Sequence, residues 1–96
     1  GRIYFGTEKG KMVALNAETA QLAWEFPVQG GIHSAPILHD GMIIFGSDGG
    51  ALYALNASTG AEVWKSQFDG EIMAAPAAAE GTVFFGCADG KIYAFE

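Results

Sequence analysis

The hydrophobic positions of this chain fall into short runs that are separated by glycine and small polar residues. Residues 2–5, 42–45 and 82–85 are rich in β-branched and aromatic side chains, and a glycine closes each run. Apolar positions that follow one another without alternation predict short β-strands covered on both faces. No segment shows the three- and four-residue apolar spacing of a helix. The pattern therefore predicts an all-β chain.

The predicted strands recur with a period of forty residues. Each opening run is followed by a glycine-containing hairpin turn, a second strand and a polar turn, at residues 16–20 and 56–60. A third strand then carries Trp24 in one copy and Trp64 in the next. Self-similarity at this period is typical of repeat architectures, in which each unit buries its core against its neighbours.

A fourth segment completes each unit, over residues 32–38 and 72–78, and contains Pro36 or Pro76. Proline cannot donate a ladder hydrogen bond, so this segment is expected to form an edge strand. Four short antiparallel strands per forty residues predict the blades of a β-propeller, with the proline strand beside the central channel and the tryptophan strand outside. We expect about two and a half blades of an incomplete ring, divided as a partial blade 1–30, a full blade 31–70 and a partial blade 71–96.

These motifs resemble the propeller repeats named after pyrroloquinoline quinone (PQQ) enzymes. The family pattern, Gly-x-aromatic-x-Gly followed by Ala-Leu-Asp-Ala-x-Thr-Gly-x-x-x-Trp, stands here as residues 44–46 and 54–64, and the resemblance covers essentially the whole chain. It implies that each tryptophan stacks against the turn of the next blade. The residues to which the resemblance gives structural docking roles are Trp24, Trp64, Asn16, Asn56, Thr19, Thr59 and Gly60.

The chain departs from the family pattern at two kinds of position. Asn16 and Asn56 replace the usual aspartate, which keeps a capping oxygen in the turn but removes its charge. Ala20 stands where the second copy has Gly60, and it should be unfavourable if that position requires a positive φ.

Composition and charge narrow the possible partners. The net charge of −6 argues against binding to nucleic acid or to an anionic membrane surface, and no run of eighteen apolar residues predicts membrane insertion. Cys87 is the only cysteine, so no internal disulfide is expected. Because two and a half blades cannot close a ring, the expected partners are the remaining blades of a longer propeller or further copies of the chain, with the identity of a protein partner unknown.

Candidate chemistry is sparse. The two histidines, His33 and His39, are six residues apart on either side of Pro36, which is not a metal-ligand spacing on one element. We assign no catalytic, cofactor-binding or metal residue. The loops at one end of the blades are expected to share a face, and the residues we place on that possible interaction face are His33, Asp48, Glu71, Met73 and Asp89.

Three functions follow from the resemblance and the composition. The first is a non-catalytic scaffold for protein interactions, like family members that act as outer-membrane assembly lipoproteins or as sensor modules, with a periplasmic or extracellular location. The second is part of a PQQ-dependent quinoprotein dehydrogenase, with PQQ and calcium held by blades outside this chain. Such enzymes commonly have a vicinal cysteine pair, which a single cysteine cannot provide. The third is a passive structural fragment without activity of its own.

Overall fold

The computed structural model describes residues 1–33, 35–68, 70–72, 76–86 and 90–95. The strands in this part of the chain are β1 (Arg2–Gly6), β2 (Lys11–Asn16), β3 (Leu22–Pro27), β4 (Ile37–His39), β5 (Met42–Gly46), β6 (Ala51–Asn56), β7 (Glu62–Gln67), β8 (Ala77–Ala79), β9 (Thr82–Gly86) and β10 (Ile92–Phe95). The described residues include no helix that is long and apolar enough to cross a membrane.

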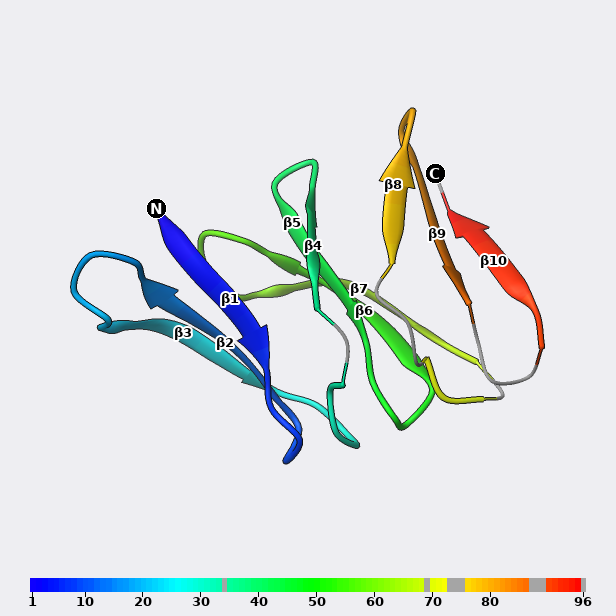
Figure 1. Ribbon diagram of the computed structural model, residues 1–96, viewed down its shortest axis with the longest axis horizontal. Coiled ribbons are helices and arrows are strands. Elements are labelled where there is room, and N and C mark those ends of the chain that lie inside the picture. The colour runs from blue at the N-terminus through cyan, green and yellow to red at the C-terminus, as the bar shows by residue number, and fades with distance from the viewer. Residues whose placement is uncertain (34, 69, 73–75, 87–89, 96) are drawn as a thin grey trace.

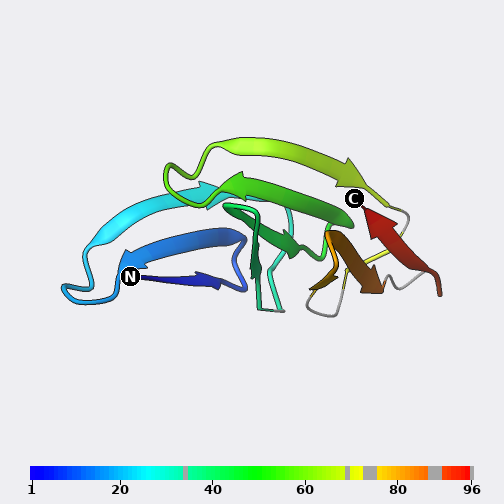
Figure 2. The same ribbon diagram turned by 90° about the horizontal axis from the view of Figure 1, so that it is seen from above.

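The strands form three antiparallel sheets that follow one another along the chain (Figure 1). Their orders are β1-β2-β3, β4-β5-β6-β7 and β10-β9-β8, so each sheet is a meander of consecutive strands. Figure 2 shows the same sheets from above, with the long strands β3 and β7 along one side of the molecule. The prediction of an all-β chain built from antiparallel blades is confirmed.

The three sheets repeat one register. In the first sheet Tyr4 pairs with Ala14, and in the central sheet Ile44 pairs with Ala54. Both β2 and β6 then shift register against the next strand, directly after the alanine that faces the tryptophan. Such an irregularity bends the strand locally and re-aims the side chains beside it. The small alanine leaves room for the large tryptophan on the neighbouring strand.

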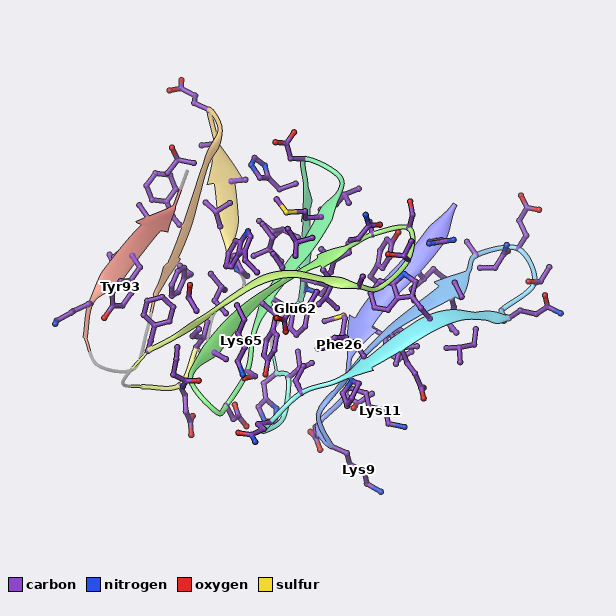
Figure 3. The ribbon with its side chains drawn as sticks, turned by 180° about the vertical axis from the view of Figure 1, so that it is seen from behind. Lys9, Lys11, Phe26, Glu62, Lys65 and Tyr93 are labelled. Atoms are coloured by element: carbon purple, nitrogen blue, oxygen red, sulfur yellow. The ribbon has the colours of Figure 1, made fainter. Side chains whose placement is uncertain are left out.

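The hydrophobic core lies between the sheets in two layers. The first layer joins Met12, Ala14 and Trp24 of the first sheet to Phe45 and Tyr53 of the central sheet. Phe26, labelled in Figure 3, packs against this layer. Its ring meets that of Tyr53 edge to face. The second layer covers the opposite face of the central sheet, which explains why the middle strands of this sheet are apolar at consecutive positions.

The second layer joins the central sheet to the third. Ile44, Leu52 and Ala54 of the central sheet pack with Val83 and Phe85 of the third. Each layer contains one pair of stacked rings, and the two pairs have nearly the same geometry. Phe45 stacks on Tyr53 with ring centroids 5.2 Å apart, and Phe85 stacks on Tyr93 at 5.3 Å.

An isoleucine from each linker closes the end of the preceding blade. Ile32 and Ile72 are buried, and their side chains lie against Gly6 and Gly46, where any added Cβ would overlap them. The backbone N–H of Ile32 also donates to the carbonyl of Thr7 at 2.9 Å. Gly6 and Gly46 are thus required by the close approach of the next linker.

The predicted fourth strand is shorter than expected. We expected strands over residues 32–38 and 72–78, whereas β4 and β8 comprise only Ile37–His39 and Ala77–Ala79. Both begin directly after a proline, which has no N–H to offer the ladder. Upstream of Pro36 the backbone turns instead to the preceding blade, as the Ile32 hydrogen bond shows. Residues 73–75 of the second segment lie outside the described part.

Ala20 occupies a left-handed backbone conformation in the first polar turn. Its φ is 59°, and the equivalent Gly60 has a φ of 78°. This region costs an L-residue roughly 1–2 kcal/mol, whereas glycine adopts it freely. The position does need a positive φ, and alanine is strained there.

Ala20→Gly should therefore stabilise the chain. Relief of the strain is partly offset by the greater freedom of glycine in the unfolded state, so we expect the free energy of unfolding to rise by roughly 0.5–1 kcal/mol. Urea denaturation followed by circular dichroism measures the change. Ala17→Gly is the matched control, because Ala17 is equally exposed in the same turn without a positive φ. The control should destabilise, and a stabilising effect of both variants would contradict the strain at Ala20.

Candidate functional site

The polar turns are held by their own side chains. The Oδ1 atom of Asn56 accepts hydrogen bonds from the N–H groups of Ser58 at 2.8 Å and Thr59 at 3.1 Å, and Thr59 Oγ1 accepts one from Ala61. Asn16 and Thr19 make the same bonds in the first turn. Asparagine and threonine at this spacing therefore fix the turn locally, whether or not a neighbouring blade covers it.

Trp24 lies directly on the turn of the next blade. Its indole Nε1–H donates to the carbonyl of Ala57 at 3.0 Å, and the side chain is only 8% exposed. The ring covers Gly60 so closely that a Cβ added there would lie 2.6 Å from it. Gly60 thus serves two purposes, because it supplies the positive φ and leaves space for the indole.

Two further side chains bind the same turn. Arg2 Nη1 donates to the carbonyls of Ala57 at 2.9 Å and Ser58 at 2.8 Å, and the Tyr4 hydroxyl donates to Ala57 at 3.3 Å. Three donors from one blade therefore converge on one carbonyl of the next. Arg2 and Tyr4 were not predicted to contact the turn, although their alternation on β1 places them on the face that carries Trp24.

Trp64 has the equivalent position on β7, opposite Ala54. It is half-buried and lines a cavity of about 210 Å³ at the boundary between the second and third sheets. The residues that share this cavity are His39, Asp40, Met42, Ile44, Gly81 and Val83.

A second cluster lies at the other end of the blades, where the hairpin turns and the linkers meet. His33 Nε2 lies 2.6 Å from Asp48 Oδ2, and both side chains are partly exposed, at 48% and 31%. The backbone N–H of Asp48 also donates to the carbonyl of Gly31 at 2.9 Å. The linker after the first blade is thus tied to the first hairpin of the second blade by a side-chain and a main-chain contact.

Of the other residues predicted on the interaction face, only Glu71 lies in the described part of the chain. Glu71 is exposed on the linker after the central sheet. Met73 and Asp89 lie outside the described residues. His39 is not near His33, since it belongs to the cavity beside Trp64. Within the described part, no three His, Cys, Asp or Glu side chains are grouped closely enough to hold a metal ion.

The described residues do not fit PQQ with calcium. Such a site needs an aromatic floor for the quinone and oxygen ligands for the ion. Trp24 is buried against Gly60, and Trp64 lies in the equivalent position between the next two sheets. The indole of Trp24 has no face open to a cofactor, and the described residues include no group of three acidic, histidine or cysteine side chains that could hold the ion, so we derive no chemistry through PQQ.

Comparison with known proteins identifies the family to which the repeat belongs. A family model described as outer membrane protein assembly factor BamB matches residues 1–50 and again residues 43–96. The chain belongs to this family of PQQ-like propeller repeats. Among curated protein sequences no match is found.

Solved structures of propeller proteins resemble the chain over nearly its whole length. BamB from Moraxella catarrhalis is 30% identical with a TM-score of 0.87, over 99% of this chain and 30% of that one. Quinohemoprotein alcohol dehydrogenase ADHIIG from Pseudomonas putida is 22% identical with a TM-score of 0.87, over 100% of this chain and 17% of that one. The computationally designed Ika4 protein is 17% identical with a TM-score of 0.86, over 98% and 59% respectively. The latter two show the fold alone. The chain spans less than a third of the BamB structure that it matches.

Trp24→Ala should destabilise the chain strongly, because it removes a buried ring and a buried hydrogen bond. We expect the free energy of unfolding to fall by roughly 3–5 kcal/mol, as is usual when a buried aromatic side chain is truncated. Trp64→Ala is the matched control and should cost clearly less, since Trp64 is only half-buried. Urea titrations followed by circular dichroism compare the two. Equal losses would contradict the role of the turn in covering Trp24.

Proposed function

We propose that this chain is a non-catalytic segment of a propeller scaffold that binds protein partners in outer membrane protein assembly. The observation that carries the proposal is the 30% identity with BamB over 99% of the chain, together with the family match. The location that goes with this function is periplasmic or extracellular. The partners are proteins, and the remaining blades belong to the same propeller.

The loop end of the blades is the surface that we propose for partner binding. Loops at one end of a rigid scaffold are where propellers and similar folds carry binding residues. The contact between His33 and Asp48 fixes two of these loops relative to each other, which lowers the entropy that binding must remove. The exposed carboxylates of Glu8 and Glu71, with a net chain charge of −6, favour a partner with a basic surface.

Photo-crosslinking in the full-length protein tests this surface. A photoreactive residue placed at position 48 or at position 33 should give one discrete protein adduct in cells that make the protein. Position 18 is the control, because Glu18 is exposed in a turn at the opposite end of the strands. Equal adducts at all three positions, or none, would contradict the proposed surface.

Charge-matched substitutions test the consequence for assembly. Asp48→Asn should reduce the amount of folded outer membrane protein, because it weakens the contact with His33 and removes a surface carboxylate. Glu18→Gln removes one exposed carboxylate elsewhere and should leave that amount unchanged. If Asp48→Asn and His33→Ala are both silent, the segment acts only as a passive structural part of its propeller.

A titration with the cofactor distinguishes the dehydrogenase function from the scaffold function. Its solved relative is 22% identical, which supports the shared fold and no shared activity. Adding PQQ with Ca²⁺ to the chain should leave its tryptophan fluorescence without saturable quenching, because both indoles lie between blades. Saturable quenching that requires both components would favour the enzyme and contradict the scaffold proposal.

A further inference from the structure

Strands β3 and β7 occupy equivalent places in the first two repeats and lie along one side of the molecule (Figure 2). Each is the last strand of its sheet in the described part of the chain, as the orders β1-β2-β3 and β4-β5-β6-β7 show. A strand at the edge of a sheet has backbone N–H and carbonyl groups that can pair with a further strand. The two edges nevertheless differ in the groups that they offer.

Hydrogen bonds to the preceding strand show which backbone groups point away from each sheet. The N–H of Val28 donates to the carbonyl of Gly10 at 2.8 Å, and the N–H of Phe68 donates to the carbonyl of Gly50 at 2.8 Å. Successive residues of an antiparallel strand direct their backbone groups alternately to its two sides. The residue directly before each donor, and the residue two positions before that, therefore direct their backbone groups outward.

On β3 these two outward positions are unsuited to a further strand. They are Pro27 and Glu25, and Pro27 has no N–H to donate. The charge of Glu25 already has a partner, because its Oε1 lies 3.5 Å from Lys11 Nζ within the same sheet. Proline on an edge strand is one of the features that prevent pairing with another chain. The edge of β3 is therefore blocked.

On β7 the same two positions are open. They are Gln67 and Lys65, which are both exposed and both keep their backbone N–H. Ala51 stands where the first repeat has Lys11, and within the described residues Lys65 forms no ion pair. The Nζ atom of Lys65 instead lies 5.3 Å from the ring centroid of Tyr53, its neighbour on β6. The β7 edge thus offers both backbone groups and a charge.

We propose that the outer edge of β7 binds an extended segment of a partner protein, which adds antiparallel to β7 and places a carboxylate side chain opposite Lys65. The outward backbone groups of Lys65 and Gln67 form the hydrogen bonds of this added strand. The ammonium group of Lys65 favours an acidic residue there, because opposite charges on directly facing residues stabilise a strand pair. This edge is separate from the loops that carry His33 and Asp48, and the inference is independent of the proposed scaffold function.

The same lysine argues against a second copy of this chain as the occupant. Two β7 strands that pair about Lys65 would place one ammonium group directly opposite another, and like charges in that position are unfavourable. A charged residue on an edge strand commonly keeps identical edges from associating. The register shift beside Ala54 also leaves only a short regular stretch of β7. The added strand is therefore short, and its binding is weak enough to be measured best by NMR.

The test is an NMR titration of the isotope-labelled chain with the synthetic peptide Thr-Thr-Val-Glu-Val-Thr-Thr. We expect saturable shifts of the backbone amide signals of Lys65 and Gln67. This peptide should bind roughly fivefold more tightly than the same peptide with lysine in place of glutamate. Lys65→Glu should reverse the preference between the two peptides. Such a reversal cannot arise from a damaged fold.

A second variant tests the backbone groups. Gln67→Pro gives β7 the residue that β3 has at the equivalent position, and it should weaken binding roughly tenfold because it removes an outward N–H without affecting the ladder to β6. Gln67→Ala is the matched control, since it loses the 2.7 Å side-chain bond to the Gly49 carbonyl but keeps the backbone donor. It should bind like the wild-type chain. Circular dichroism shows whether each variant is folded.

Three results would overturn the proposal. The first is an absence of saturable shifts at Lys65 and Gln67 in the folded wild-type chain. The second is binding that is unchanged in folded Gln67→Pro, or a charge preference that is unchanged in Lys65→Glu, either of which would place the peptide elsewhere. The third is a dimer of the chain in sedimentation that Lys65→Glu or Gln67→Pro dissociates, which would make a second copy the occupant. If Gln67→Pro does not fold, the charge preference alone decides.

Discussion

The contact between the Trp24 indole and the turn at Gly60 is the constraint on which this arrangement of blades depends. Each sheet can bury its apolar side chains only against another sheet, and nothing within a sheet fixes the distance to its neighbour. The indole fixes that distance, because it lies flat on a residue without a side chain and donates to the carbonyl of Ala57. Arg2 and Tyr4 add two donors to the same group, so the position of the turn is determined from one side by three polar contacts.

The rest of the core follows from this spacing. Phe45 and Tyr53, cross-strand neighbours in the central sheet, stack in the layer that this sheet shares with the first, and Ile32 closes the end of the first blade against Gly6. The central sheet offers its other face to the third sheet, where Ile44, Leu52 and Ala54 pack with Val83 and Phe85.

The sequence predicted those features that are repeated in it. The forty-residue period, the turn chemistry of asparagine and threonine, and the strain at Ala20 all depend on local physics and on positions that recur. Arg2 and Tyr4 could not be predicted in this way, because the next repeat has Met42 and Ile44 there. The inner strands β4 and β8 are shorter than the pattern predicts, because proline has no N–H for the ladder and the backbone before Pro36 bonds to the preceding blade. The contact of His33 with Asp48 joins residues fifteen positions apart, and it depends on the path of a linker that the period does not specify.

A double-mutant cycle between Trp24→Ala and Gly60→Ala tests the central contact most directly. With Trp24 present, the methyl group at position 60 meets the indole and also suffers the backbone strain of a positive φ. With Trp24 removed, only the strain remains. We therefore predict that the two losses in unfolding free energy are not additive, with a coupling of roughly 1–3 kcal/mol. Losses that add to within about 0.5 kcal/mol would contradict the account, since they would show that the indole and the glycine do not interact.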